Sequence, residues 1–212
     1  MPLICKLTGL DTVRLGVWQN VEGDQYFFDH LDLYIPEREE VDHLKTRKKS
    51  EWLCSRYLLY QVAGHGLRGA CLKDQYGKPF IHGSDEFISI SHTFNYTAVI
   101  VSRKVCGIDL QVIVPKIIPI GVRFINSIEL SFIPDDNKLS YYHVIWGAKE
   151  AMYKCYGKRE LDFRTHIRVG NFIFDKDGFE FEGEVKKGDY QKNYKIYGRQ
   201  IDQMILVYAL EN

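Results

Sequence analysis

The stretch YYHVIWGAKEAMYKCYG, residues 141–157, predicts a long helix, and the order of the elements around it decides the fold. Trp146, Glu150 and Lys154 follow one another at intervals of four residues, so they share one face of such a helix. Gly157 stands where this helix is expected to end. On a solvated face, a Glu–Lys pair at this spacing is common and contributes only about 0.2–0.5 kcal/mol. A tryptophan on the same face indicates that the pair is partly buried.

The stretch VCGIDLQVI, residues 105–113, predicts a strand before this helix, entered through Gly107. Because side chains alternate faces along a strand, Asp109 and Gln111 face one way, and Ile108 and Leu110 the other. Gly107 leaves room for another group to approach that strand. Two oxygen-bearing side chains on one face are able to bind a hard cation, but the same pattern is typical of an ordinary half-exposed strand.

The remaining segments predict a repeated order of strands and helices. LICKL and VRLGVW near the start are short strands, and a helical region opens near Pro36 and ends at Gly64, Gly66 and Gly69. The sequence leaves open whether this region is one helix or two. FISISH and TAVIVS are the next two strands, joined by a turn.

After the helix at residues 141–157 the chain is mostly β. Asp177-Gly178, set between alternating aromatic residues, predicts a tight hairpin, and residues 194–210 predict a second hairpin. Each half then has the order β, α, β, β. We therefore predict an α+β protein made of two similar halves, residues 1–104 and 105–212, each a small antiparallel sheet packed with a long helix.

The composition narrows the function class. The 212 residues include 28 Lys and Arg against 28 Asp and Glu, so the net charge is zero, which argues against a dedicated nucleic-acid binder. The five cysteines are scattered and form no C-x-x-C pair, which argues against a zinc site or a disulfide framework. The sequence has no signal-peptide pattern and no apolar run of membrane-spanning length. We expect a reduced, soluble, cytoplasmic protein without a nucleic-acid or membrane partner.

Three further polar motifs have side chains that are able to bind an anion, although each is also common in segments that bind no ligand. Gly77-Lys78-Pro79 reads as a surface turn, and Ser91-His92 ends a strand, where polar groups are able to reach a ligand. The basic run at residues 45–49, with Arg56 beyond it, is typical of a solvated helix face, but arginine and lysine are also the side chains that bind phosphate. The sequence contains no glycine-rich phosphate loop, so side chains would have to hold any nucleotide.

Taken in order, the motifs GKP, SISH, GIDLQ and WGAKEAMYK resemble those of the 4′-phosphopantetheinyl transferases. More specifically, they are similar to the longer, single-chain class that activates surfactin synthetase. The family's usual patterns are G-I/V-D-I/V-E and W-x-x-K-E-A/S-x-x-K, found here at residues 107–111 and 146–154. The motifs span residues 77–154, over a third of the chain. The resemblance implies a pseudo-dimer of two α+β halves, with coenzyme A bound in the cleft between them.

Such enzymes transfer the phosphopantetheine arm of coenzyme A to a serine of an apo acyl or peptidyl carrier protein, with Mg²⁺, and release adenosine 3′,5′-bisphosphate. The resemblance implies that Asp109 and Glu150 bind Mg²⁺, and that Glu150 is also the general base toward the serine. Lys154 would contact the phosphates and help the leaving group. The residues expected around coenzyme A are Lys78, Ser91, His92, Arg47, Arg56 and Lys149. A monomer is expected.

One position departs from the family pattern. The second acidic residue of the G-I-D-I-E motif is Gln111 here, whose neutral side-chain oxygen is expected to bind Mg²⁺ directly or through water. The lost negative charge should weaken cation binding. Two other hypotheses therefore stay open: a coenzyme A-binding relative that has lost turnover, and a scaffold protein with no ligand.

Overall fold

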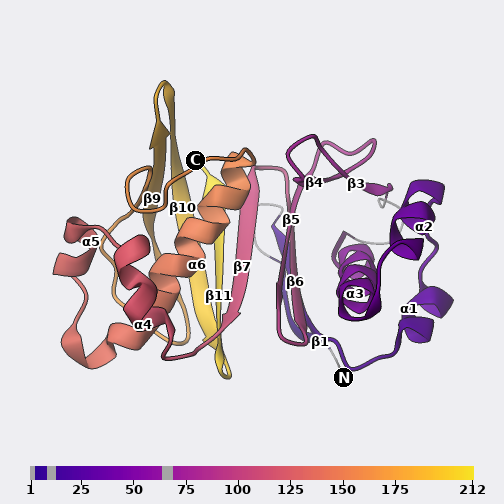
Figure 1. Cartoon of the computed structure of the whole chain (residues 1–212), viewed down its shortest axis with the longest axis horizontal. Helices are drawn as coiled ribbons and strands as arrows, with labels where there is room; N and C mark the ends of the chain where they lie inside the picture. Colours follow the sequence, from indigo (N-terminus) through magenta and orange to yellow (C-terminus); the bar gives the residue numbers. More distant parts are fainter. Residues whose placement is uncertain (1–2, 9–12, 64–68) are drawn as a thin grey trace. The chain divides into compact units, whose positions relative to one another are not determined.

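The structure is a computed structural model that describes residues 3–8, 13–63 and 69–212, with the backbone alone for residues 4–8. The chain divides into two compact units, Met1–Arg103 and Lys104–Asn212. Each unit contains one antiparallel sheet and helices, so the expected α+β class is confirmed (Figure 1). None of the helices in the described ranges combines the length and the apolar character needed to cross a membrane.

The first unit is built on a six-stranded sheet in the order β1-β2-β6-β5-β4-β3. Three helices accompany it, and the longest, α3, packs on β2 and β6. Buried apolar side chains such as Leu53, Leu58 and Val99 form the core between this helix and the sheet. The elements are β1 (Leu3–Thr8), β2 (Arg14–Gln19), α1 (Asp24–His30), α2 (Ile35–Asp42), α3 (Thr46–Ala63), β3 (Cys71–Lys73), β4 (Pro79–Ile81), β5 (Phe87–Thr93) and β6 (Tyr96–Ser102).

The helical region near Pro36 is two helices rather than one. Pro36 lies in the first turn of α2, where its missing N–H costs nothing. Residues 43–45 separate α2 from α3, and Thr46, the first residue of α3, has a φ of 43°, a left-handed conformation that cannot continue a right-handed helix from α2. Helix α3 ends at Ala63, and the expected stop residues Gly64 and Gly66 lie outside the described residues.

The second unit is built on a five-stranded sheet in the order β7-β11-β10-β9-β8. Helix α6 packs on β7 and β11, and Gly157 ends it with a left-handed φ of 69°, as predicted (Figure 1). The elements are β7 (Cys106–Val112), α4 (Ile117–Ile120), η1 (Gly121–Arg123), α5 (Ser127–Ser131), η2 (Asp135–Asn137), α6 (Lys138–Tyr156), β8 (Ile167–Val169), β9 (Phe179–Lys187), β10 (Tyr190–Ile201) and β11 (Met204–Glu211).

The hairpin predicted at Asp177-Gly178 is wider than a tight turn, because β8 and β9 pair antiparallel but the aromatic residues before Asp177 lie outside both strands. Strand β8 ends at Val169, and residues 170–178 form a loop between β8 and β9. Within this loop, the backbone of Phe172 and Phe174 bonds to the side chain of Tyr141. The tyrosine hydroxyl donates to the Phe172 carbonyl at 3.2 Å and accepts from the Phe174 N–H at 3.4 Å. The Phe172 ring stacks on Phe181 at 4.5 Å between centroids, so alternating aromatics here fill the core from a loop.

Two tight turns do join the long strands of this sheet. Lys187 of β9 pairs with Tyr190 of β10, which leaves a two-residue turn that begins at Gly188 with a φ of 56°. Strands β10 and β11 form the second predicted hairpin, which is confirmed, and Asp202 in its turn has a φ of 50°. Positive φ values at the start of such turns match the twist of the strands they join.

Candidate functional site

Two glycines let α6 pack directly on β7. A Cβ atom at Gly107 would collide with the carbonyl oxygen of Ala151 on the helix. A Cβ atom at Gly147 would lie 2.9 Å from Nε2 of Gln111 and 2.8 Å from a methyl group of Val207. Because neither glycine has a side chain, the strand face that carries Asp109 and Gln111 lies against the helix.

This packing brings Asp109 and Lys154 together. The Lys154 ammonium group donates to Oδ1 of Asp109 at 3.1 Å and to the backbone carbonyl of Ile108 at 2.6 Å. The side chains are 26% and 11% exposed respectively, so the ion pair is only partly screened by solvent. Two residues that are distant in sequence thus form one polar cluster at the surface of the unit.

Glu150 is the titrating group of this cluster. Burial and the negative charge of Asp109 raise the pKa of Glu150 from 4.5 to about 7, although the positive charge of Lys154 opposes the shift. A carboxyl group with a pKa near 7 is able to accept or release a proton at neutral pH. Perturbed carboxyl groups beside a second charge are enriched at functional sites.

The carboxylates of this cluster fit a cation shared with a phosphate ligand. Within the described residues, no group of three or more His, Cys, Asp or Glu side chains could hold a metal ion. Mg²⁺ is nevertheless commonly bound by one or two carboxylates together with substrate phosphates and water. Asp109 and Glu150 supply two such carboxylates, and the electrostatic coupling between them is the repulsion that a bound cation relieves.

Gln111, expected to bind the cation beside Asp109, directs its amide nitrogen and not its oxygen toward Asp109. Its Nε2 atom donates to Oδ2 of Asp109 at 3.1 Å and to the carbonyl oxygen of His143 at 3.0 Å. Its Oε1 atom lies 2.6 Å from Nδ1 of His143. The amide therefore presents its nitrogen to Asp109, because the two acceptors on that side would repel an oxygen.

The expectation that Lys149 faces the phosphates of coenzyme A is wrong. Its side chain has no exposed surface, and its ammonium group forms an ion pair with the equally buried Glu129. The same ammonium group lies 2.7–2.9 Å from three backbone carbonyl oxygens, those of Phe124, Phe163 and Ile167. Three N–H donors that are already surrounded by four acceptors leave none for a phosphate.

The first unit contains a basic hollow of about 310 Å³ between α3 and the sheet edge. Arg56 and His92, two of the residues expected around coenzyme A, both line it, together with Lys48 and Lys73. Two carboxylates, Glu40 and Glu51, lie at the same hollow. Its lining residues are Glu40, Leu44, Lys48, Glu51, Trp52, Ser55, Arg56, Lys73, Pro79, Ile90 and His92.

A chain of buried hydrogen bonds orients the His92 ring at this hollow. Its Nδ1 atom lies 3.2 Å from the hydroxyl oxygen of Thr97, a residue with no exposed surface. The Thr97 hydroxyl donates to the side-chain oxygen of Asn20 at 3.1 Å, and the Cys54 thiol donates to the same oxygen at 2.9 Å. Because its own proton is used in this way, the Thr97 oxygen accepts a hydrogen bond from Nδ1 of His92.

The guanidinium group of Arg56 is buried and already has partners within the protein. Its side chain is 3% exposed, lies 3.7 Å from Glu37 and 3.4 Å from Glu40, and stacks over the Trp52 ring at 4.2 Å. Lys73 also pairs with Glu40. Burial would raise the pKa of Glu40, but the hydrogen bond and charge of Lys73 and the charge of Arg56 bring it below the ordinary value. Arg56 therefore forms the charged wall of the hollow.

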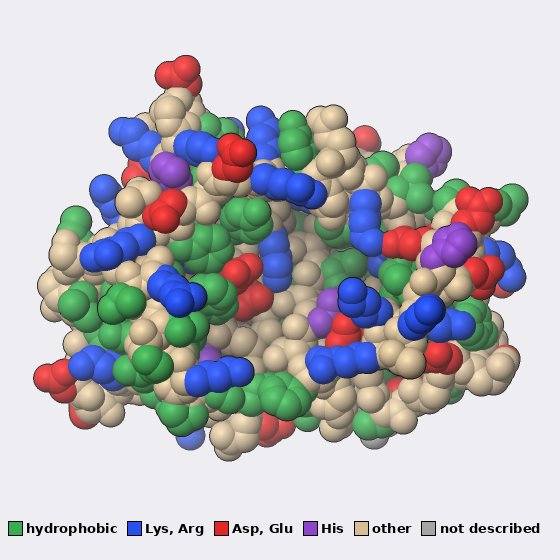
Figure 2. Space-filling model, in the orientation of Figure 1, with side chains coloured by type: hydrophobic (Ala, Val, Ile, Leu, Met, Phe, Trp, Pro, Cys, Tyr) green, Lys and Arg blue, Asp and Glu red, His purple; other side chains and the backbone are tan. Residues whose placement is uncertain are grey.

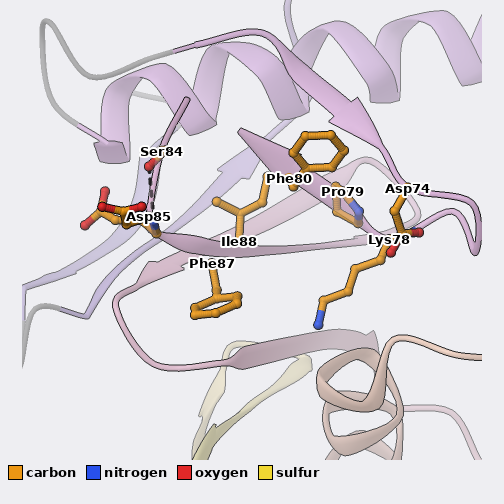
Figure 3. Close-up of a pocket in the computed structure, with 9 residues that line it drawn as sticks. Asp74, Lys78, Pro79, Phe80, Ser84, Asp85, Phe87 and Ile88 are labelled. Carbon is orange, nitrogen blue, oxygen red and sulfur yellow. Dashed lines mark hydrogen bonds between the residues drawn. The ribbon is translucent and has the colours of Figure 1, made fainter. Parts of the chain in front are cut away.

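The other expected coenzyme A residues lie elsewhere in the same unit. Lys78 lines a second hollow of about 470 Å³, where Figure 3 shows its side chain and the Phe87 ring extending toward the same side. Ser91 is 5% exposed. Arg47 does not line either hollow; it pairs with Glu51 at 2.7 Å and donates to the Phe94 carbonyl at 3.1 Å.

Sequence reasoning missed two residues of these sites. Lys73 is the last residue of the short strand β3 and carries no signal that would connect it to Arg56. His143 does carry one, since it precedes Glu150 by seven residues and therefore shares its helix face. Figure 2 shows both acidic and basic side chains on one face of the molecule, so the zero net charge reflects a mixture of both signs and not a lack of charge.

Comparison with known proteins agrees with the motifs. The chain is 33% identical over 88 residues to a 4′-phosphopantetheinyl transferase of Bacillus subtilis. The matched segment makes up 40% of this chain and spans 39% of the length of that relative. No protein-family profile matches the chain. The similarity supports a relationship to the 4′-phosphopantetheinyl transferase superfamily.

Proposed function

We propose that this protein transfers the 4′-phosphopantetheine group of coenzyme A to a serine of an apo acyl or peptidyl carrier protein. The observation that carries the proposal is the raised pKa of Glu150, which is about 7 beside the Asp109–Lys154 ion pair. A phosphoryl transfer to a hydroxyl group needs a base with a pKa near the working pH and positive charge near the phosphates. The similarity to a phosphopantetheinyl transferase supports the same reaction class.

In the proposed reaction, the serine oxygen forms a bond to the β-phosphorus of coenzyme A, and the bond from this phosphorus to the bridging oxygen breaks. The carboxylate of Glu150 takes the serine proton, and adenosine 3′,5′-bisphosphate leaves with the bridging oxygen. Lys154 stabilises the negative charge on the leaving group. Asp109 and Glu150 would hold Mg²⁺, which neutralises pyrophosphate charge when it is bound.

The basic hollow of the first unit is the proposed site for the phosphorylated nucleotide end of coenzyme A. Lys48, Lys73 and His92 provide the positive charge there, and Arg56 is fixed behind them. We also propose Lys78 as a phosphate contact and Ser91 as a coenzyme A contact. Arg47 is a further proposed contact, but its charge is already paired with Glu51.

The finer assignments belong to the same proposal. Each unit pairs one antiparallel sheet with one long helix, 18 residues in α3 and 19 in α6, which supports a pseudo-dimer of related halves. We further propose the longer single-chain class, a monomer, and a cytoplasmic location, where both coenzyme A and carrier proteins are found.

The direct test is mass spectrometry of an apo carrier protein after incubation with this protein, coenzyme A and Mg²⁺. We expect a gain of one phosphopantetheine group, which Asp109→Ala and Glu150→Ala abolish. The matched control is Lys138→Ala, a surface change on the same helix, which should leave the gain intact. Full activity of the Glu150→Ala variant would refute the assigned base, and no gain with any carrier protein would refute the proposed transfer.

A second candidate function is coenzyme A binding without turnover, which the neutral Gln111 favours. Both candidates predict that coenzyme A and Mg²⁺ raise the melting temperature. They differ in the carrier assay, where only the transferase produces a mass gain. If coenzyme A leaves the melting temperature unchanged, both fail and a scaffold role is favoured.

A further inference from the structure

A chain of hydrogen bonds runs from the backbone after β7 to the carboxylate of Asp109. The N–H of Val114 donates to Nε2 of His143 at 2.9 Å, and the same nitrogen lies 3.2 Å from the carbonyl oxygen of Val114. Nδ1 of His143 lies 2.6 Å from Oε1 of Gln111, and Nε2 of Gln111 reaches Oδ2 of Asp109 at 3.1 Å. His143 is only 2% exposed, so solvent is a poor substitute for any of these partners.

The acceptors at the end of the chain fix the direction of every bond. The end of Gln111 near Asp109 faces a carboxylate oxygen and the carbonyl oxygen of His143, which are acceptors only. That end must therefore be the NH₂ group, and Oε1 must face the imidazole. Nδ1 of His143 then carries the proton that it donates, and because a backbone N–H is only a donor, Nε2 accepts from Val114.

Asp109 is consequently held on both carboxylate oxygens. Lys154 donates to Oδ1 and Gln111 donates to Oδ2, each at 3.1 Å. Gly147 supplies the space, since a Cβ atom there would lie 2.9 Å from the Gln111 nitrogen. Both hydrogens of the Gln111 amide and its oxygen are engaged inside the protein.

We propose that Gln111 and His143 are positioning residues that orient Asp109, and that Gln111 is not a cation ligand. This inference rests on the proposed transferase function. The amide that replaces the usual glutamate is then not a weakened ligand, and cation binding depends on Asp109 and Glu150. His143, which touches neither carboxylate oxygen of Asp109, acts through Gln111.

The two roles of Gln111 make opposite predictions for His143→Phe. If Gln111 were a cation ligand, loss of the imidazole would free its oxygen, and cation affinity would stay the same or rise. If Gln111 positions Asp109, the variant should bind Mn²⁺ about 10-fold more weakly, because groups that orient a ligand typically contribute 10–100-fold to metal affinity. Electron paramagnetic resonance of Mn²⁺, with coenzyme A present, measures this directly.

A thermodynamic cycle with Gln111→Met separates positioning from simple structural support. Both single variants should lower kcat about 10-fold without a matching rise in the KM for coenzyme A, and the double variant should be no worse than either, since both remove one chain of bonds. The matched control is His166→Phe, because His166 also accepts from a backbone N–H, that of Asp162, away from Asp109. Additive losses, or an equal loss in the control, would overturn the proposal.

A measurement on the unaltered protein keeps the inference testable even if the variants do not fold or the transferase function fails. Nitrogen NMR of ¹⁵N-histidine-labelled protein should show His143 as the Nδ1–H tautomer, the less common form of neutral histidine. The Nε2–H tautomer would reverse the amide and overturn the inference. Failure of the carrier assay with the expected tautomer would refute the transferase proposal alone.

Discussion

Lys149 on α6 and Glu129 on α5 form an ion pair in which neither side chain has any exposed surface, with Nζ 2.8 Å from Oε2. Glu129 also accepts from the backbone N–H groups of Asn126 and Val169, both at 2.9 Å. Lys149 in turn donates to backbone carbonyl groups that precede and follow α6 in the sequence, those of Phe124 and Ile167 among them. This pair joins α5, α6 and β8, so the lysine of the W-x-x-K-E pattern stabilises the unit that carries the site.

We expect Lys149→Met to lower the free energy of unfolding by about 3–5 kcal/mol, because it leaves the buried Glu129 charge without its partner. Urea unfolding followed by circular dichroism measures the loss. Lys138→Ala is the matched control, since its partner Asp135 is 99% exposed, and surface pairs of this kind contribute about 0–1 kcal/mol. Equal losses in the two variants would contradict the buried pair as the cause.

Gly107→Ala should destabilise the second unit and misplace Asp109. The new methyl group would collide with the carbonyl oxygen of Ala151, which backbone atoms of a helix cannot easily avoid. Overpacking of this kind typically costs about 1–3 kcal/mol, measurable by urea unfolding. Gly178→Ala serves as the control, because a Cβ atom there meets nothing within 4 Å. A Gly107→Ala variant as stable as this control would refute the close contact.

Without metal, the contribution of Glu150 to stability should fall as the pH rises from about 4.5 to about 7. The pKa of Glu150 is about 7 in the folded protein and 4.5 at its ordinary value, so the folded state binds a proton that the unfolded state has lost. Stability then falls by at most about 1.4 kcal/mol per pH unit from this group and levels off above pH 7. Urea unfolding in EDTA tests this, and Glu150→Gln should remove this contribution to the slope.

The Cys54 thiol should resist alkylation in the folded protein. Burial raises its pKa from 9.0 to about 12, so almost no thiolate is present at pH 8. Iodoacetamide treatment followed by peptide mass mapping should leave Cys54 unmodified in buffer and modify it in urea. Rapid modification of native Cys54 would show that this part of α3 opens to solvent.

Local sequence patterns predicted the elements around the site. The spacing of Trp146, Glu150 and Lys154 placed them on one helix, alternation placed Asp109 and Gln111 on one strand face, and Gly157 marked the helix end. These are local properties, because helical and strand periodicities follow from backbone geometry. The tight hairpin predicted at Asp177-Gly178 shows the limit, since aromatic residues alternate there for contact with Tyr141 and Phe181 and not for strand pairing.

The contacts of those side chains depend on the packing of segments that are distant in sequence. Lys149 and Lys154 belong to one motif, yet Lys149 forms a fully buried ion pair with Glu129, whereas Lys154 pairs with Asp109 at the surface. The direction of the Gln111 amide depends on His143, which lies 32 residues away along the chain. Burial, charge and hydrogen bonding act through space between segments that are distant in sequence. The motif therefore names the candidate residues, and packing of α6 on β7 assigns their roles.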